Sequence, residues 1–131
     1  MKNYSRQREA ILDVLRSTDT HPTANWIYTE VRKEIPNISL GTVYRNLSAL
    51  TEAGDILCIN LGNGTDRFDG DISAHLHLHC NCCDEIEDVQ LEKNAFLKIA
   101  KERGFIPRNS IYVIEGICKK CNLKTILNGG N

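Results

Sequence analysis

The sequence lacks the features that would direct a chain into or across a membrane. Its first 10 residues hold no apolar stretch of the kind found in secretory signals. No apolar run reaches the roughly 20 residues that span a bilayer. Without export, the six cysteines are expected to be metal ligands or free thiols rather than a disulfide framework. We therefore expect a cytoplasmic protein.

The sequence also lacks a charge excess. Sixteen Lys and Arg stand against 17 Asp and Glu, and the net charge is −1. The overall charge therefore gives no signature of nucleic-acid binding, and a prediction of DNA binding depends on motifs. Apart from two similar cysteine pairs, the chain has no internal repeat.

The first half of the chain predicts three short helices. An amphipathic helix over 5–17 comes first. Thr23 is placed to cap a second helix, and Ser39 a third that ends at Gly54. The third helix turns an apolar stripe to one side and leaves Tyr44 and Arg45 on the other. An aromatic beside an arginine favours a helix that approaches a ligand closely, although Arg45 in a generic three-helix domain would simply be solvated.

A β-hairpin is predicted after these helices. Strands over 56–61 and 65–69 flank a Gly62-Asn63-Gly64 turn. Three helices followed by a hairpin are typical of a winged helix-turn-helix. We therefore predict an α+β protein in which residues 1–69 form a winged-helix DNA-binding domain.

A hinge and a second domain are predicted after Asp69. Residues 70–73 read as a hinge, and residues 74–131 as a small α/β domain for dimerisation and metal binding. Its predicted elements are strands over 75–80, 85–89, 111–118 and 123–127 and a helix over 91–103.

Four cysteines form a C-x-x-C…C-x-x-C set: Cys80, Cys83, Cys118 and Cys121. Four thiolates are the composition of a structural zinc site, and a rubredoxin-like iron centre is the main rival. Cys82 lies inside the first pair and complicates the choice of ligands. Cys58 is most simply a small buried apolar residue.

Three of the four histidines alternate along one predicted strand. His75, His77 and His79 would project to the same face. Two of them with one carboxylate, Asp88 or Asp69, would resemble the two-His-one-carboxylate arrangement that leaves open positions on Fe(II). The competing interpretation is an exposed polar strand with solvated acids.

The whole set of motifs resembles the ferric-uptake-regulator family of metal-dependent repressors, and within it the peroxide-sensing branch. The matching segments are His21-Pro22-Thr23-Ala24, Ser39 to Leu47, Arg67-Phe68-Asp69, and His75 to Cys80 with both cysteine pairs. Asp at position 88, where iron sensors usually carry Glu, favours the peroxide branch.

The resemblance implies specific roles. Cys80, Cys83, Cys118 and Cys121 would hold structural zinc, and Tyr44 and Arg45 would read DNA. The regulatory Fe(II) or Mn(II) would be held by His21, Asp69, His75, His77 and Asp88. Oxidation of His21 or His75 by peroxide would release a homodimer from an AT-rich palindromic operator.

Two positions in the sequence depart from the family pattern. His79 is an additional histidine that could compete as a ligand, and residues 108–110 lack the histidines that many iron and zinc regulators carry. Other interpretations are a reversible Fe- or Mn-uptake regulator, a non-haem iron enzyme, and a thiol redox module built on the C-x-x-C pairs. No pattern typical of a substrate pocket supports the enzyme, so a non-enzymatic regulator is expected.

Overall fold

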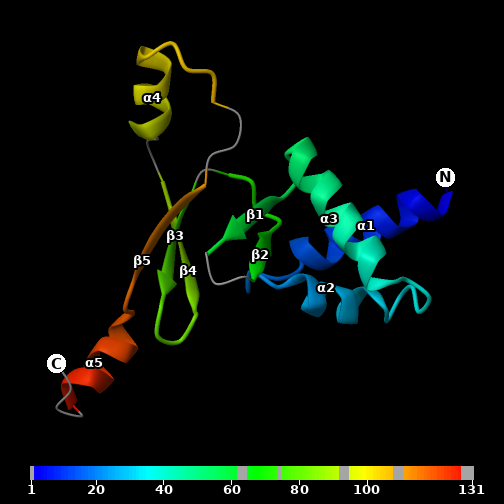
Figure 1. The fold of residues 1–131 in the computed structure, drawn as a ribbon, viewed down its shortest axis with the longest axis horizontal. Coiled ribbons are helices and arrows are strands. Elements are labelled where there is room, and N and C mark those ends of the chain that lie inside the picture. Colours follow the sequence, from blue (N-terminus) through cyan, green and yellow to red (C-terminus); the bar gives the residue numbers. More distant parts are fainter. Residues whose placement is uncertain (1, 62–64, 74, 92–94, 108–110, 128–131) are drawn as a thin grey trace. The chain divides into compact units, whose positions relative to one another are not determined.

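The computed structural model describes residues 2–61, 65–73, 75–91, 95–107 and 111–127 (Figure 1). The chain divides into two compact units, which we call unit 1 (Met1–Ile72) and unit 2 (Ser73–Asn131). None of the helices in these ranges combines the length and apolarity needed to cross a membrane.

Unit 1 begins with three helices, α1 (Lys2–Arg16), α2 (Ala24–Val31) and α3 (Leu40–Ala53). The predicted caps are confirmed. Thr23 accepts a hydrogen bond from the backbone N–H of Trp26, and Ser39 accepts one from that of Thr42. Gly54 ends α3 with φ 81°, a left-handed conformation that glycine adopts without a steric cost.

A hairpin of β1 (Leu57–Asn60) and β2 (Asp66–Asp69) completes unit 1. The strands are antiparallel, and Leu57 pairs with Asp69. The predicted Gly62–Gly64 turn lies outside the described residues. Helices and hairpin enclose one apolar core, which includes Ile11, Leu15, Ile27, Val43, Leu47, Leu50, Ile56 and Phe68. The predicted winged-helix order and α+β class are confirmed.

Unit 2 is built on a three-stranded sheet with β3 (His75–Cys80) in the centre. β4 (Ile86–Gln90) pairs with it antiparallel, and β5 (Tyr112–Gly116) pairs parallel on its other edge. Between β4 and β5 the chain forms α4 (Ala95–Glu102). The predicted helix over 91–103 is longer than α4, and its residues 92–94 lie outside the described part.

The predicted strand over 123–127 is wrong, because this segment belongs to the helix α5 (Lys119–Leu127). The alternation of apolar residues there is too short to distinguish a strand from a helix. Leu123 and Ile126 are three residues apart, which suits one face of a helix, and both are exposed. The second cysteine pair therefore lies at the start of a helix rather than between two strands.

The described part of unit 2 has little apolar core. Cys80 and Cys121 are its only buried residues of the hydrophobic class, and α4 buries none of its side chains. The clearest contact of α4 with the sheet is Phe96, whose ring stacks on that of Tyr112 with centroids 5.0 Å apart.

Candidate metal centres

Four cysteines of unit 2 lie together at the C-terminal end of β3. The Sγ atoms of Cys80, Cys83, Cys118 and Cys121 are all within 4.8 Å of one another, and those of Cys83 and Cys118 are 3.8 Å apart. Thiolates bound tetrahedrally to Zn(II) at about 2.3 Å stand roughly 3.8 Å from each other. Both the donor set and the spacing therefore fit Zn(II).

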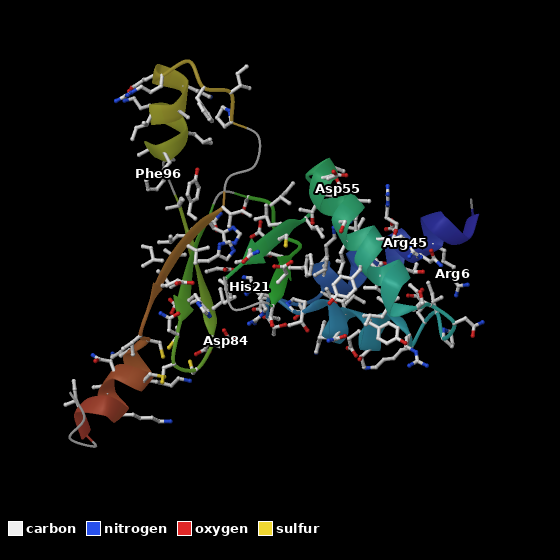
Figure 2. The ribbon with its side chains drawn as sticks, in the orientation of Figure 1. Arg6, His21, Arg45, Asp55, Asp84 and Phe96 are labelled. Carbon is white, nitrogen blue, oxygen red and sulfur yellow. The ribbon has the colours of Figure 1, made fainter. Side chains whose placement is uncertain are left out.

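Sheet register and one tight turn bring the two cysteine pairs together. Cys80 pairs with Gly116 of β5, so the chain that leaves β5 carries Cys118 toward it. Asp84, which Figure 2 labels in the turn between β3 and β4, donates its N–H to the Cys80 carbonyl at 2.9 Å. Asp84 also adopts φ 65°, an uncommon conformation for a residue other than glycine. This turn folds Cys83 back toward Cys80.

Backbone N–H groups stabilise Cys80 as a thiolate. The N–H groups of Cys118, Cys82 and Cys83 donate to Cys80 Sγ at 3.2, 3.4 and 3.5 Å. These hydrogen bonds, with that from Cys118 the strongest cause, lower the pKa of Cys80 to about 6. Because the thiolate is the form that binds metal, Cys80 is largely in its ligand form at neutral pH.

The other two cysteines differ from this group and from each other. Cys82 is exposed, and a hydrogen bond that the protonated Cys121 thiol donates to the Cys82 sulfur raises the pKa of Cys121. Cys58 lies half-buried on β1 in unit 1, packed against the apolar core. Burial, followed by the charge of Asp66 and a hydrogen bond to it, raises the pKa of Cys58 to about 11. Cys58 is therefore a neutral thiol at physiological pH.

A second ligand group of unit 2 combines two histidines with one aspartate. His75 Nε2 and His77 Nε2 lie 3.6 and 3.7 Å from the same oxygen, Asp88 Oδ1. The other ring nitrogen of each histidine faces a backbone carbonyl: Nδ1 of His75 is 2.7 Å from that of Ser73, and Nδ1 of His77 is 3.2 Å from that of Tyr112. A carbonyl only accepts, so Nδ1 carries a proton, and in the neutral form of each ring Nε2 presents its lone pair toward Asp88.

Unit 1 carries a matching pair of ligand types. His21 Nε2 lies 3.3 Å from Asp69 Oδ2, and both side chains are buried. Asp69 is the last residue of β2, and its Oδ1 accepts the N–H of Asp71 at 2.9 Å. Gly70 follows directly, and a Cβ there would meet the Leu15 backbone at 3.1 Å. A side chain at position 70 would therefore displace the strand end that presents Asp69.

Arg67 fixes the loop that presents His21, a role that sequence reasoning missed. Its Nε donates to the His21 carbonyl, and its second guanidinium nitrogen donates to the Thr20 carbonyl at 3.2 Å. The Phe68 N–H adds a bond to the Pro22 carbonyl at 2.9 Å. His21 itself has φ 53°, so the loop needs such support. The signal available in the sequence was Arg67 two residues before Asp69.

His79 has carboxylate partners of its own. Its Nε2 is 2.6 Å from Asp84 Oδ1, and its Nδ1 is 3.6 Å from Glu115 Oε1. The histidine side chain is 95% buried, as follows from its 5% exposure. Asp88, in contrast, is close to both His75 and His77. The extra histidine on β3 is thus oriented by different acids.

The predicted DNA-reading residues lie on the exposed side of α3. Tyr44 is 48% exposed, and Arg45 is exposed and labelled on α3 in Figure 2. Arg45 donates to the Thr42 hydroxyl at 3.0 Å, which holds the guanidinium along the helix. Val43, Leu47 and Leu50 on the other side are buried in the core of unit 1. The helix therefore offers an aromatic and a cation to a ligand without losing packing.

Known proteins resemble this chain over most of its length. The model of the "Ferric uptake regulator family" matches residues 2–111. The "Peroxide-responsive repressor PerR" of Staphylococcus aureus strain USA300 is 36% identical over 120 residues, which are 90% of this chain and 81% of that protein.

Solved structures share the fold. The crystal structure of the Campylobacter jejuni peroxide stress regulator superposes with a TM-score of 0.74 and 31% identity, covering 91% of each chain. A zinc uptake regulator solved with zinc and DNA superposes with a TM-score of 0.64 over 92% of this chain and 83% of that one. At 20% identity, the latter supports the fold alone.

Proposed function

This chain belongs to the ferric uptake regulator family, and from that premise we propose that it is a peroxide-responsive transcriptional repressor. In this proposal, a cytoplasmic homodimer binds structural Zn(II) through its four clustered cysteines. It holds a regulatory Fe(II) or Mn(II) through histidines and aspartates, and it binds DNA only while that ion is in place.

The observation that carries the proposal is the orientation of His75 and His77 toward Asp88. Each ring has its Nδ1 occupied by a backbone carbonyl and its Nε2 within 3.7 Å of one carboxylate oxygen. Two neutral imidazoles and one carboxylate suit Fe(II) or Mn(II) and leave coordination positions open.

We further propose that His21 and Asp69 complete this ligand set. His21 Nε2 and Asp69 Oδ2 are 3.3 Å apart. This distance is similar to the 3.6 and 3.7 Å from His75 Nε2 and His77 Nε2 to Asp88 Oδ1. Two aspartates neutralise a divalent ion, whereas without the ion their charges would repel each other. An ion bound by both units would fix the angle between them. Shifting a closed form from 1% to 99% needs about 5.5 kcal/mol of differential binding.

Peroxide sensing would follow from oxidation of a ligand. Fe(II), when bound, supplies the redox chemistry that activates peroxide, and Mn(II) does not. In the net reaction, one oxygen of hydrogen peroxide is added to the imidazole of His21 or His75, and the other leaves as water. The oxidised ring is a poorer ligand, so the ligand set weakens and the DNA is released.

The DNA interface in this proposal is the exposed side of α3 with Tyr44 and Arg45. In a dimer, two such helices would meet successive major-groove half-sites of an AT-rich palindrome, about 34–36 Å apart. Unit 2 supports dimerisation because a second copy would cover its exposed apolar side chains. Those exposed above half of their surface include Phe96, Ile99, Phe105, Ile106 and Ile114.

The test is to load zinc-containing protein with Fe(II) or Mn(II), add near-stoichiometric hydrogen peroxide, and record peptide masses. One added oxygen on the peptide holding His21 or His75, with Fe(II) but not Mn(II), is the expected result. Binding to a duplex selected from a randomised pool should fall in parallel. If no oxygen is added while zinc stays bound, the protein is instead a reversible Fe- or Mn-uptake repressor of the same family. Oxidation confined to cysteines would favour a thiol sensor.

A pair of variants tests the ligand assignment. Asp88→Ala should abolish Mn(II)-dependent DNA binding, because His75 and His77 lose their shared carboxylate. Glu87→Ala is the matched control, since Glu87 is the exposed neighbour on β4 and pairs with Leu78. Equal DNA binding by the two variants in Mn(II) would contradict the assignment.

A further inference from the structure

His79 is a buried histidine that the proposed regulatory site does not use. It lies on β3 two residues after His77 and points to the same face of the sheet. Its side chain is 5% exposed, and its Nδ1 has no hydrogen-bond partner. An imidazole nitrogen buried without a hydrogen bond is costly, so its surroundings call for an explanation.

The atom that faces this nitrogen is a carboxylate oxygen at the spacing of metal ligands. Glu115 Oε1 lies 3.6 Å from His79 Nδ1, which is beyond hydrogen-bond distance. Two ligand atoms bound at about 2.1 Å to one ion, at tetrahedral to trigonal angles, stand roughly 3.4–3.6 Å apart. The histidine–aspartate pairs described above have the same spacing, between 3.3 and 3.7 Å.

Asp84 fixes His79 in the tautomer that a metal ligand at Nδ1 requires. Its Oδ1 lies 2.6 Å from His79 Nε2, a hydrogen-bond distance much shorter than the distance to Glu115. A carboxylate that accepts from Nε2–H leaves the lone pair on Nδ1, directed toward Glu115. A carboxylate behind the ring is the usual support of a metal-bound histidine. In His75 and His77, Nδ1 faces a backbone carbonyl and Nε2 faces the proposed metal position. In His79 these roles are reversed, because Nε2 faces Asp84 and Nδ1 faces Glu115.

Sheet pairing holds the two candidate ligands in place. Residue 79 of β3 is the register partner of residue 115 of the parallel strand β5. Both side chains therefore rise from neighbouring strands of a hydrogen-bonded sheet, and neither depends on a loop. Glu115 is 47% exposed, which leaves room for water on an ion.

We propose that His79 and Glu115 form an accessory site for a divalent transition-metal ion in unit 2, with Asp84 as the residue that orients His79. One nitrogen and one carboxylate suit Mn(II), Fe(II) or Co(II). With only two protein ligands, water fills the remaining positions, and the site is weaker than the four-cysteine group. The site is independent of the proposed repressor function.

The test counts Mn(II) ions in a chain whose regulatory group is disabled. Asp88→Ala protein with zinc bound is titrated with Mn(II), and the loss of the free-ion electron paramagnetic resonance signal gives the bound equivalents. One saturable equivalent per chain is expected. Adding Glu115→Gln should remove it, and adding Asp84→Asn should weaken it about tenfold, as found for residues that orient metal ligands.

The matched control is Glu87→Gln in the same Asp88→Ala background. Glu87 is another exposed glutamate of the same sheet, and its register partner is Leu78, so its side chain lies on the opposite face from His79. Zinc content and circular dichroism confirm folding of each variant. The site does not exist if Asp88→Ala binds no saturable Mn(II), or if Glu87→Gln lowers binding as much as Glu115→Gln. In the otherwise native chain, Glu115→Gln should leave the peroxide response intact, which separates this proposal from the repressor function.

Discussion

The two units are stabilised by different means. Unit 1 buries a continuous set of aliphatic and aromatic side chains from three helices and a hairpin. In the described part of unit 2 the buried side chains are instead three histidines and two cysteines. Burial of one large aliphatic side chain stabilises a fold by about 1.5–3 kcal/mol, so unit 1 can rely on its own core. Within a single chain, the described part of unit 2 buries no comparable set of apolar side chains.

The difference suggests a second role for the proposed metal ligands of unit 2, because they are also the side chains that its described part buries. A structural metal commonly replaces an apolar core in small domains. Cys80 and Cys118 tie β3 to the chain that follows β5, where a larger domain would place packed aliphatic residues. If the four cysteines bind zinc as proposed, we expect metal binding to be coupled to folding in unit 2, whereas the apolar core of unit 1 folds without it.

Removal of zinc should have the largest effect and should affect only unit 2. Structural Zn(II) contributes about 10–16 kcal/mol in small zinc-dependent domains near neutral pH. We expect Cys118→Ser or strong chelation to unfold β3, β4 and β5 while α1, α2 and α3 remain. Hydrogen exchange resolved by peptide measures both units in one experiment.

The control for zinc removal is Cys82→Ser, which changes an exposed thiol in the same turn but none of the four clustered ligands. Its exchange pattern should match that of the native chain. Protection of β3 that survives both chelation and Cys118→Ser would mean that unit 2 has another source of stability, and the contrast between the units would fail.

A cavity in the apolar core should have the next largest effect, and only on unit 1. Leu47 is 1% exposed, so Leu47→Ala is expected to cost about 2–5 kcal/mol of unfolding free energy. Ile114→Ala on β5 is the matched truncation in unit 2, where the side chain is 57% exposed. It should leave unfolding of unit 2 nearly unchanged and instead weaken dimerisation, measured by sedimentation equilibrium. Equal unfolding costs at the two sites would contradict the comparison.

The smallest expected effect is the pH dependence that Cys58 gives to unit 1. Its pKa is about 11 in the folded chain and 9.0 without the fold, because burial and Asp66 favour the neutral thiol. This stabilisation is fully present below pH 9 and is lost as the pH rises through 11. Cys58→Ala should remove that part of the pH dependence of unfolding. At pH 8, Cys58 should also react with iodoacetamide more slowly than the exposed Cys82.

Much of unit 1 could be predicted from the sequence because its signals are local. Thr23, Ser39 and Gly54 mark helix ends by their own chemistry, and each does so in the structure. The helical spacing of Val43, Leu47 and Leu50 was enough to identify the buried side of α3.

In unit 2, the four clustered cysteines could be chosen from the sequence by the equal spacing of their two pairs, with Cys82 left out.

The features that could not be predicted from the sequence depend on contacts between distant segments. Arg67 reaches the carbonyl of His21, 46 residues away in the sequence. Glu115 faces His79 only because β5 pairs with β3 in parallel, and no local pattern specifies that register. The prediction for segment 123–127 failed for a different reason. Its pattern is local, but the apolar alternation is so short that it suits both a strand and a helix.

The alternation of His75, Leu76, His77, Leu78 and His79 along β3 also constrains how the gene can change. Inserting or deleting one codon within the strand would turn every later side chain to the opposite face of the sheet. Such an event between His75 and His77 would remove His77 and His79 from their carboxylate partners together and shift Cys80 from its place opposite Gly116. Point substitutions can alter these sites one at a time, so we expect divergence along β3 to proceed by substitution at constant length.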